Sequence, residues 1–254
     1  MATEISIRLL QGLPSIRAGD DLPELIFAAI RRSDARLDDG DIVVIAQKIV
    51  SLAEGRLVRL DDVHPSAKAI DLADEVEKDP RIVELILAES TDVVRTKPGV
   101  IIVRHRLGIV GANAGIDQSN VDHSEGECAL LLPEDPDQSA RRLCEILMRE
   151  TGRTLGVIIS DSLNRPWRLG STGIAIGSSG VSVLDDRRGQ CDLYGRELKV
   201  TLSNRADAIA AAAVLIMGEA SERTPVAMVS GFPAEDSSQT ARDSVRPVSD
   251  DMFL

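Results

Sequence analysis

The sequence predicts a protein of the α+β class, and three observations support this. Helical and strand patterns mix along the 254 residues without the regular alternation of a doubly wound parallel sheet. Several strand patterns are joined by short turns, as in antiparallel hairpins. Hydrophobic residues make up 43% of the chain and aromatic residues only 2%, so a sizeable core must be built from Ile, Leu, Val and Ala.

Helices are expected where apolar residues recur every three to four positions. In chain order they cover residues 20–32, 65–77, 80–90, 137–152 and 205–218. Asp20 or Asp21 can cap the first of these helices and Asp137 can cap the fourth, because an Asp carboxylate accepts from exposed N–H groups. Gly218 is a suitable C-terminal cap for the fifth.

Strands are expected at apolar or β-branched runs that turn residues bound. In chain order they cover residues 5–10, 42–46, 92–95, 100–103, 107–110, 155–160, 195–203 and 225–231. The Gly/Pro segment 11–15 ends the first strand, the segment 51–56 leaves the second, and 96–99 is a hairpin turn. We expect a polar loop over 111–122, a possible subdomain over about 92–152, and an extended or partly disordered tail over 232–254.

Charge and cysteine content restrict the partners and the location. The net charge of −12 and the scarcity of aromatic rings argue against nucleic acid as a partner. Cys128, Cys144 and Cys191 are scattered, which suits a reducing cytosol better than a disulfide framework. The N-terminus does not resemble a secretory signal, and the longest apolar run, 208–217, is too short to span a membrane. These features predict a soluble cytoplasmic protein.

Three acidic residues lie at the ends of predicted elements. Asp161 follows a strand, Asp117 lies in the polar loop, and Glu219 follows the glycine that ends the last helix. With the hydroxyl of Ser162, they supply the oxygen ligands that Mg²⁺ or Mn²⁺ prefers. The alternative is that they are turn, cap and solvated residues, and their spacing leaves both interpretations open.

Several common catalytic motifs are absent. None of the five lysines follows a glycine, which excludes a P-loop, and there is no G-x-S-x-G motif of a serine hydrolase. His64, His105 and His123 show no spacing typical of a metal site. The sequence therefore assigns no catalytic nucleophile or base.

The stretch 160–180, SDSLNRPWRLGSTGIAIGSSG, is rich in Gly and Ser. It is either a loop that lets the backbone approach a ligand, or a site of close backbone packing or a β-bulge. We expect Trp167 to pack beneath this loop, with cover over a flat ligand ring as the alternative. Arg165 and Arg168 are candidates to bind anionic groups of a substrate.

Seven segments occur together in the order typical of the coenzyme F420-0:L-glutamate ligase family. They are LQGLPSI, AQKIVSLAEGR, NAGIDQSNV, LLPEDPDQSA, GVIISDSLNRPWRLGSTGIAIGSSG, DLYGREL and ADAIAAAAVLIMGEASERTPVAMVSG. The chain therefore resembles this family from about residue 9 to residue 231.

The resemblance implies a ligase domain over 1–231 with an unusual two-domain α+β fold that intertwines as a homodimer. It implies an enzyme that joins L-glutamate to F420-0 through an amide bond and then adds further γ-linked glutamates. GTP would be the co-substrate, with two Mg²⁺ or Mn²⁺ ions and K⁺ as cofactors, and an acyl phosphate would activate the carboxylate. Alternatives are a related ligase acting on a dehydro precursor or another acceptor, and a catalytically silent nucleotide-binding relative.

The resemblance also implies roles for individual residues. Asp117 and Asp161 would share one metal ion, and Ser162 and Glu219 would help to hold a second. The positions implied for GTP are Gly12, Leu13, Pro14, Ser15, Gln47, Lys48, Leu52, Asn120, Met217, Gly218, Glu219, Ala220, Ser221, Glu222, Arg223 and Thr224.

Two departures from the family pattern are visible. Many members have Lys where this chain has Leu52, so another cation, such as Lys48, would have to meet phosphate here. Some bacterial relatives carry a flavin-binding domain after this one, whereas we expect this chain to be a stand-alone ligase.

Overall fold

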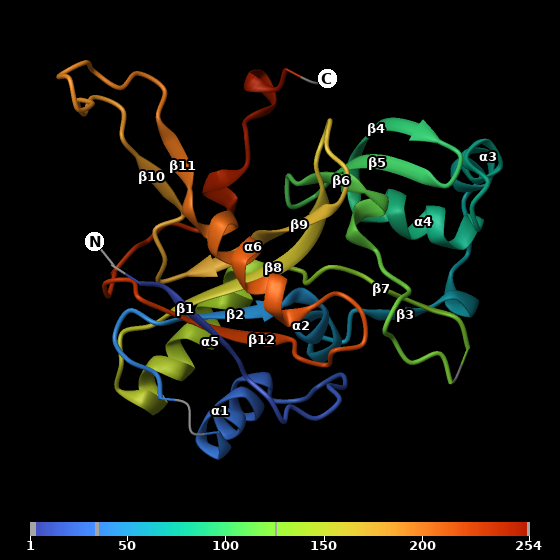
Figure 1. Ribbon diagram of the computed structural model, residues 1–254. Helices are drawn as coiled ribbons and strands as arrows, with labels where there is room; N and C mark the ends of the chain where they lie inside the picture. Colours follow the sequence, from blue (N-terminus) through green and yellow to red (C-terminus); the bar gives the residue numbers. More distant parts are fainter. Residues whose placement is uncertain (1–3, 34–35, 125, 253–254) are drawn as a thin grey trace.

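The fold is built around a five-stranded mixed sheet (Figure 1). The computed structural model describes residues 4–33, 36–124 and 126–252. The strand order across the sheet is β1 (Ser6–Leu9), β12 (Val226–Ser230), β2 (Ile42–Ala46), β8 (Gly156–Asn164) and β9 (Ser171–Ser179). Only β2 and β8 pair in parallel, and the other neighbours are antiparallel.

Helices cover both faces of this sheet, because successive side chains of a strand point to opposite sides. On one face, α1 (Leu22–Arg32) and α5 (Pro136–Thr151) pack against residues such as Val43, Val157 and Ile159. On the other face, α6 (Arg205–Met217) packs against Val44 and Ile158. The result is a three-layered core of aliphatic side chains.

A second group of elements lies to one side of the sheet (Figure 1). It contains α3 (Ala67–Val76), α4 (Pro80–Ala88) and the antiparallel sheet of β4 (Ser90–Lys97), β5 (Val100–His105) and β6 (Val110–Ala112). The pair β3 (Leu57–Arg59) and β7 (Cys128–Leu130) connects it to the main sheet, with the short helices η1 (Leu60–Asp62) and η2 (Asn113–Gly115).

This second group has its own hydrophobic cluster, formed by residues between Leu60 and Ala129. Helix α5 packs instead on β8 and β9. The subdomain over about 92–152 stays a prediction.

The mixture of helices and strands confirms the α+β class, and most elements lie where the sequence predicts them. Helix α2 (Gln47–Ala53) was not predicted; it begins directly after β2 and has no side-chain cap. The three-residue strands β3 and β7 were also not predicted, since three residues carry no readable alternation. The strand predicted over 107–110 is mostly wrong: only Val110 lies in a strand, β6, and the residues before it form a turn. Of the strand predicted over 195–203, only the part in β11 (Leu202–Asn204) forms.

The cap predicted for α5 is wrong by two residues. Asp135, not Asp137, is the N-cap and accepts from the Gln138 N–H at 3.0 Å. The Asp137 carboxylate accepts instead from the N–H groups of Ser178, Ala241 and Arg242, at 2.9, 2.8 and 3.2 Å. It therefore ties the C-terminal segment to the edge strand β9.

The C-terminal segment is more ordered than predicted. It contains two 3₁₀ helices, η3 (Ala241–Ser244) and η4 (Val248–Asp250), and it folds back beside β9 (Figure 1). Arg104 of β5 pairs with Asp251 at 3.1 Å between guanidinium nitrogen and carboxylate oxygen.

The glycine-rich stretch 160–180 is mostly a β-hairpin: it comprises the end of β8, a short connecting tip and β9. Gly173 and Gly177 lie within β9, where added Cβ atoms would meet the carbonyl oxygens of Ala210 and Pro136 at 2.6 and 2.3 Å. The register with β8 shifts between Ile159 and Ser160, as at a β-bulge. Close packing and a bulge therefore account for these glycines.

Candidate active site at one edge of the central sheet

Four strands begin or end along the same side of the main sheet, the side toward which the carboxyl ends of β2 and β8 point. We call this side the site edge; it is distinct from the edge strands β1 and β9. The pair Ala46–Ser160 is the last between the parallel strands β2 and β8, so both strands point toward this edge. Strand β12 starts there, since the Ala46 N–H donates to Pro225 at 2.8 Å. Strand β1 ends there, since the Leu10 N–H donates to Val226 at 2.9 Å. Ligand sites of open sheets favour the carboxyl ends of parallel strands.

The polar loop delivers Asp117 to this edge. Its backbone pairs with Leu130 of β7 through N–H···O contacts of 3.0 and 2.8 Å. The Lys48 Nζ, in the first turn of α2, lies 2.6 Å from Asp117 Oδ2 and donates to Ser119 Oγ at 3.1 Å. Burial opposes ionisation of Asp117, but hydrogen bonds from Lys48 and Ser119 outweigh it and lower its pKa.

Asp161 is the second carboxyl at this edge. Burial and then the charge of Asp117 raise its pKa to about 7, although hydrogen bonds from the Ser162 N–H and from Gln47 favour the ionised form. Gln47 is itself buried and oriented by Ser51, whose Oγ donates to Gln47 Oε1 at 2.9 Å. Near pH 7, Asp117 is therefore ionised while Asp161 is about half protonated, and the two charges influence each other.

This donor set fits a hard divalent cation. Two carboxyls whose charges repel each other gain the most from a cation between them, and their oxygens are the preferred ligands of Mg²⁺ or Mn²⁺. Within the described residues, however, no three His, Cys, Asp or Glu side chains are grouped so that they could hold a metal ion by themselves. Asp117 and Asp161 would therefore need oxygen atoms from a substrate or water to complete a coordination sphere.

Ser162 and Glu219 lie on the other side of β8. Ser162 faces away from Asp161 because adjacent strand residues alternate. It shares its face with Asn164, whose cross-strand neighbour Ser171 donates to the Glu219 carboxylate at 3.0 and 3.3 Å. The four predicted metal ligands are therefore arranged as two pairs on opposite faces of one strand.

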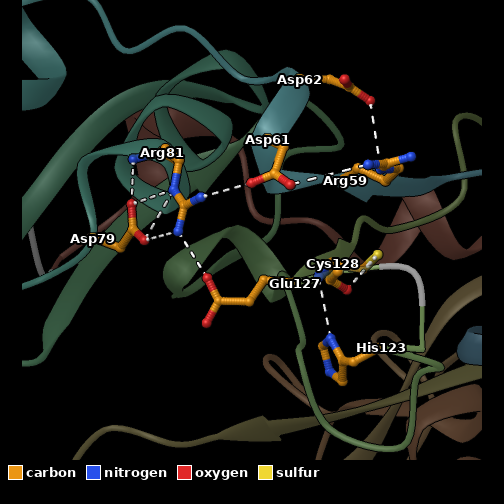
Figure 2. Close-up of polar contacts among 9 residues, drawn as sticks. Arg59, Asp61, Asp62, Asp79, Arg81, His123, Glu127 and Cys128 are labelled. Carbon is orange, nitrogen blue, oxygen red and sulfur yellow. Dashed lines mark hydrogen bonds and ion pairs between the residues drawn. The ribbon is translucent and has the colours of Figure 1, made fainter.

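The far end of the loop that carries Asp117 is anchored to the second group of elements (Figure 2). His123 Nε2 lies 2.9 Å from the Gln118 carbonyl oxygen, and the Cys128 N–H donates to His123 Nδ1 at 3.1 Å. Near β7, Arg81 contacts the carboxylates of Glu127, Asp79 and Asp61 at 2.8, 2.7 and 3.4 Å. No sequence pattern indicated His123 or Arg81: the His123 contacts are local to one loop, and the fold adds the distant Glu127 and Asp61 to the local Arg81–Asp79 pair.

Comparison with known proteins identifies the family. The sequence profile of the F420-0:gamma-glutamyl ligase family matches residues 12–231. The chain is 46% identical over 229 residues to a coenzyme F420:L-glutamate ligase from Methanothermobacter thermautotrophicus, covering 90% of each chain. It is 47% identical over 242 residues to the protein of that name from Methanopyrus kandleri, covering 94% of this chain and 93% of the relative. It is 40% identical over 243 residues to that from Methanocaldococcus jannaschii, covering 95% and 94%.

The chain belongs to the F420-0:gamma-glutamyl ligase family. The match confirms the resemblance seen in the seven sequence motifs and spans all four predicted metal ligands. None of the described helices is long and apolar enough to cross a membrane.

The segments that the ligase family resemblance implies for GTP meet at the same edge of the sheet. Gly12 to Ser15 follow β1, Gln47 and Lys48 follow β2, and residues 217–224 precede β12. The last segment forms a tight turn, in which the Thr224 hydroxyl donates to the Met217 carbonyl at 2.8 Å. Asn120 lies three residues beyond Asp117, in a left-handed backbone conformation.

Leu52 differs from the other residues that the family resemblance implies for GTP. Its side chain packs against the hydrophobic cluster beneath α2, as a leucine should. Lys48 lies one helical turn earlier and is the cation at this part of the edge. A role for Leu52 or Asn120 in nucleotide binding stays a prediction.

The prediction that Trp167 packs beneath a loop is wrong. Trp167 and Leu169 lie at the tip of the β8–β9 hairpin and are 89% and 102% exposed. Arg165 and Arg168 lie on the same exposed tip, and their binding of substrate stays a prediction. The longer strands β8 and β9 carry this tip outward from the core, which the sequence-based boundary of 155–160 did not anticipate.

Proposed function

We propose that this chain is an amide-forming ligase that joins L-glutamate to coenzyme F420-0 and adds further γ-linked glutamates. The observation that carries the proposal is the similarity, over nine-tenths or more of both chains, to proteins named coenzyme F420:L-glutamate ligase. The convergence of Asp117, Asp161 and Lys48 at one sheet edge supports it, because amide formation from a carboxylate requires charge neutralisation.

The chemistry proposed is phosphoryl transfer followed by acyl transfer. The acceptor carboxylate attacks the γ-phosphorus of GTP, the bond between that phosphorus and the bridging oxygen breaks, and GDP leaves. The amine of glutamate then attacks the acyl phosphate, phosphate leaves, and the amine proton passes to water. Such reactions depend on positioning and electrostatics more than on a protein nucleophile, which fits the absence of a nucleophile in the sequence.

In this proposal, Asp117 and Asp161 hold one divalent ion and Ser162 and Glu219 hold the second, with K⁺ as a further cofactor. When bound, these cations neutralise charge on the phosphate oxygens. Lys48 already faces the Asp117 carboxylate and adds a donor for a phosphate oxygen at the same edge.

The proposal includes a homodimer as the functional unit. The hairpin of β10 (Leu184–Asp186) and β11 projects from the main body (Figure 1) and exposes Leu193, Tyr194 and Val200 by 86% or more. Large apolar side chains gathered on a projecting arm favour burial against another protein surface. A second copy would supply such a surface for each arm.

The test is mass spectrometry of F420-0 incubated with the protein, L-glutamate, GTP and Mn²⁺. We expect a GTP-dependent gain of one or more glutamyl residues, and at least a 100-fold lower rate for Asp161→Asn and Lys48→Met. Asp62→Asn is the matched control, because Asp62 is exposed and lies in η1, outside the site.

Absence of any mass gain, with GTP still bound, would reject the proposal in favour of another acceptor or a silent relative. A gain that also proceeds with ATP in place of GTP would reject the nucleotide assignment alone.

A further inference from the structure

A cavity of about 310 Å³ is lined by two strand neighbours of Asp161. Its wall includes Ile174, the cross-strand neighbour of Asp161, and Leu163, the next residue of β8 on the same face. Directly opposed residues of antiparallel strands have Cβ atoms about 5 Å apart. The wall of the cavity therefore reaches the direct neighbours of Asp161 in the β8–β9 hairpin.

Several parts of the chain enclose this cavity. The β8–β9 hairpin, residues 107–110 before and at the start of β6, and the C-terminal segment around Val245 supply most of the wall. Residues 135–137 at the start of α5, Asp207 of α6 and Arg104 of β5 complete it. The C-terminal wall is held by Asp137 and by the Arg104–Asp251 ion pair.

The chemistry of the lining is apolar with cations at its rim. Leu163, Ile174 and Val245 are among the apolar contacts, and Arg242 and Arg246 also line the cavity. The four acidic side chains of the lining already accept hydrogen bonds or pair: Asp135 accepts from Gln138, Asp207 from Ala175 and Asp137 from three N–H groups, and Asp251 pairs with Arg104. In the described part of the chain, no ion pair occupies the guanidinium groups of Arg242 and Arg246.

We propose that this cavity binds the carboxylate-bearing end of the acceptor, an amphipathic organic anion, and directs its carboxylate to Asp117 and Asp161. This inference rests on the proposed function, because a ligase needs its acceptor carboxylate at the phosphoryl-transfer site. A volume near 310 Å³ is at the lower end for small-molecule sites, so the cavity holds one end of the acceptor. The Arg242 and Arg246 guanidinium groups attract its negative charge.

The first test fills the cavity from the C-terminal side. We expect Val245→Trp to weaken F420-0 binding at least 10-fold in isothermal titration calorimetry without nucleotide, and to raise the KM for F420-0 while the KM for GTP stays within twofold. The matched control is Val248→Trp, because Val248 is exposed on the same segment and does not line the cavity. Unchanged F420-0 affinity in a folded Val245→Trp protein would overturn the inference.

The second test does not depend on whether a tryptophan is tolerated. In a Cys191→Ser background, which removes the exposed cysteine, Ser244→Cys places a thiol in the cavity lining and Ser249→Cys places one outside it. We expect saturating F420-0 to slow alkylation of the first thiol at least fivefold and to leave the second unchanged. Equal protection of both thiols, or of neither, would overturn the inference.

The two proposals fail in distinguishable ways. Product formation with an unaffected Val245→Trp protein rejects the cavity and keeps the ligase. F420-0 binding that Val245→Trp weakens, without any product in the wild type, keeps the cavity and rejects the ligase reaction. If a second copy of the chain occupied the cavity, the thiol of Ser244→Cys would be protected from alkylation at high protein concentration, whether or not F420-0 is present.

Discussion

At the scale of single residues, Asp117 and Asp161 show how neighbouring carboxyls acquire different properties. Burial disfavours the charge on both, but Lys48 contacts Asp117 directly and lowers its pKa, whereas the resulting charge of Asp117 adds to burial at Asp161. The pair therefore carries about one negative charge below pH 7 and two above it. A divalent cation would be bound more tightly in the second state.

Asp161 should make the metal-free protein less stable as the pH rises. Its folded-state pKa of about 7 lies above the value of 3.8 expected for the unfolded chain. Its stabilising contribution to the free energy of unfolding is therefore fully present below about pH 4 and is lost as the pH rises through 7. With EDTA present, we expect Asp161→Asn to be more stable than the wild type at pH 8 by about 1–3 kcal/mol, or roughly 3–10 °C in Tm. At pH 5 the two proteins should differ much less.

Thermal denaturation at both pH values measures this difference. Addition of Mn²⁺ at pH 8 should stabilise the wild type more than Asp161→Asn, because only the wild type has the second carboxylate. Equal stability of the two proteins at pH 8 would show that Asp161 titrates normally.

At the scale of elements, the β8–β9 hairpin links the core to the site. Gly173 and Gly177 of β9 pack closely against α6 and α5, and the same hairpin carries Asp161, Ser162 and the exposed tip. The small residues let both helices approach the edge strand closely, and Asp137 and Asp207 accept its outward N–H groups at Ser178 and Ala175. The edge strand β9 is thus covered by helices and its outward N–H groups at Ser178 and Ala175 are hydrogen-bonded, which protects it from pairing with a strand of another chain.

Gly177→Ala should be strongly destabilising, by about 2–4 kcal/mol, because the added Cβ would meet the Pro136 carbonyl oxygen at 2.3 Å. Gly189→Ala is the control: its φ of +82° disfavours Ala, but nothing lies within 4 Å, so a cost of only about 1 kcal/mol is expected. Urea denaturation gives both values. Equal destabilisation by the two substitutions would mean that α5 moves away from the Cβ added by Gly177→Ala at no cost in free energy.

At the scale of the whole molecule, exposed apolar side chains gather on two projecting hairpins. Leu193, Tyr194 and Val200 lie on the β10–β11 arm, and Trp167 and Leu169 lie on the β8–β9 tip next to the candidate site. A chain with one tryptophan and one tyrosine exposes both of them on these two hairpins. The proposed homodimer would bury these side chains against a second copy of the chain.

The double variant Leu193→Glu, Val200→Glu should be monomeric in sedimentation velocity at concentrations where the wild type is dimeric. Two charges introduced on an otherwise apolar arm would have to be desolvated on association. The control is Ile70→Glu, a partly exposed position on α3, far from both hairpins. A wild type that sediments as a monomer would contradict the dimer itself.

The sequence by itself determined the local features of this protein. The apolar periodicity of α1, the continuous apolar run of α6, the turn before β5 and the caps Asp21 and Gly218 are each contained in a few neighbouring residues, so they can be read directly. The seven motifs likewise determined the family, because their order along the chain does not depend on the fold.

Only the tertiary structure decided how distant segments meet. The pairing of Ala46 with Ser160 places Lys48, Asp117 and Asp161 at one edge, and strand alternation separates Ser162 from Asp161. The exposure of Trp167 and the contact of Asp137 with the C-terminal segment also depend on how distant segments pack. Strand register, strand order and burial depend on the packing energy summed over the whole chain, so no single stretch of sequence determines them.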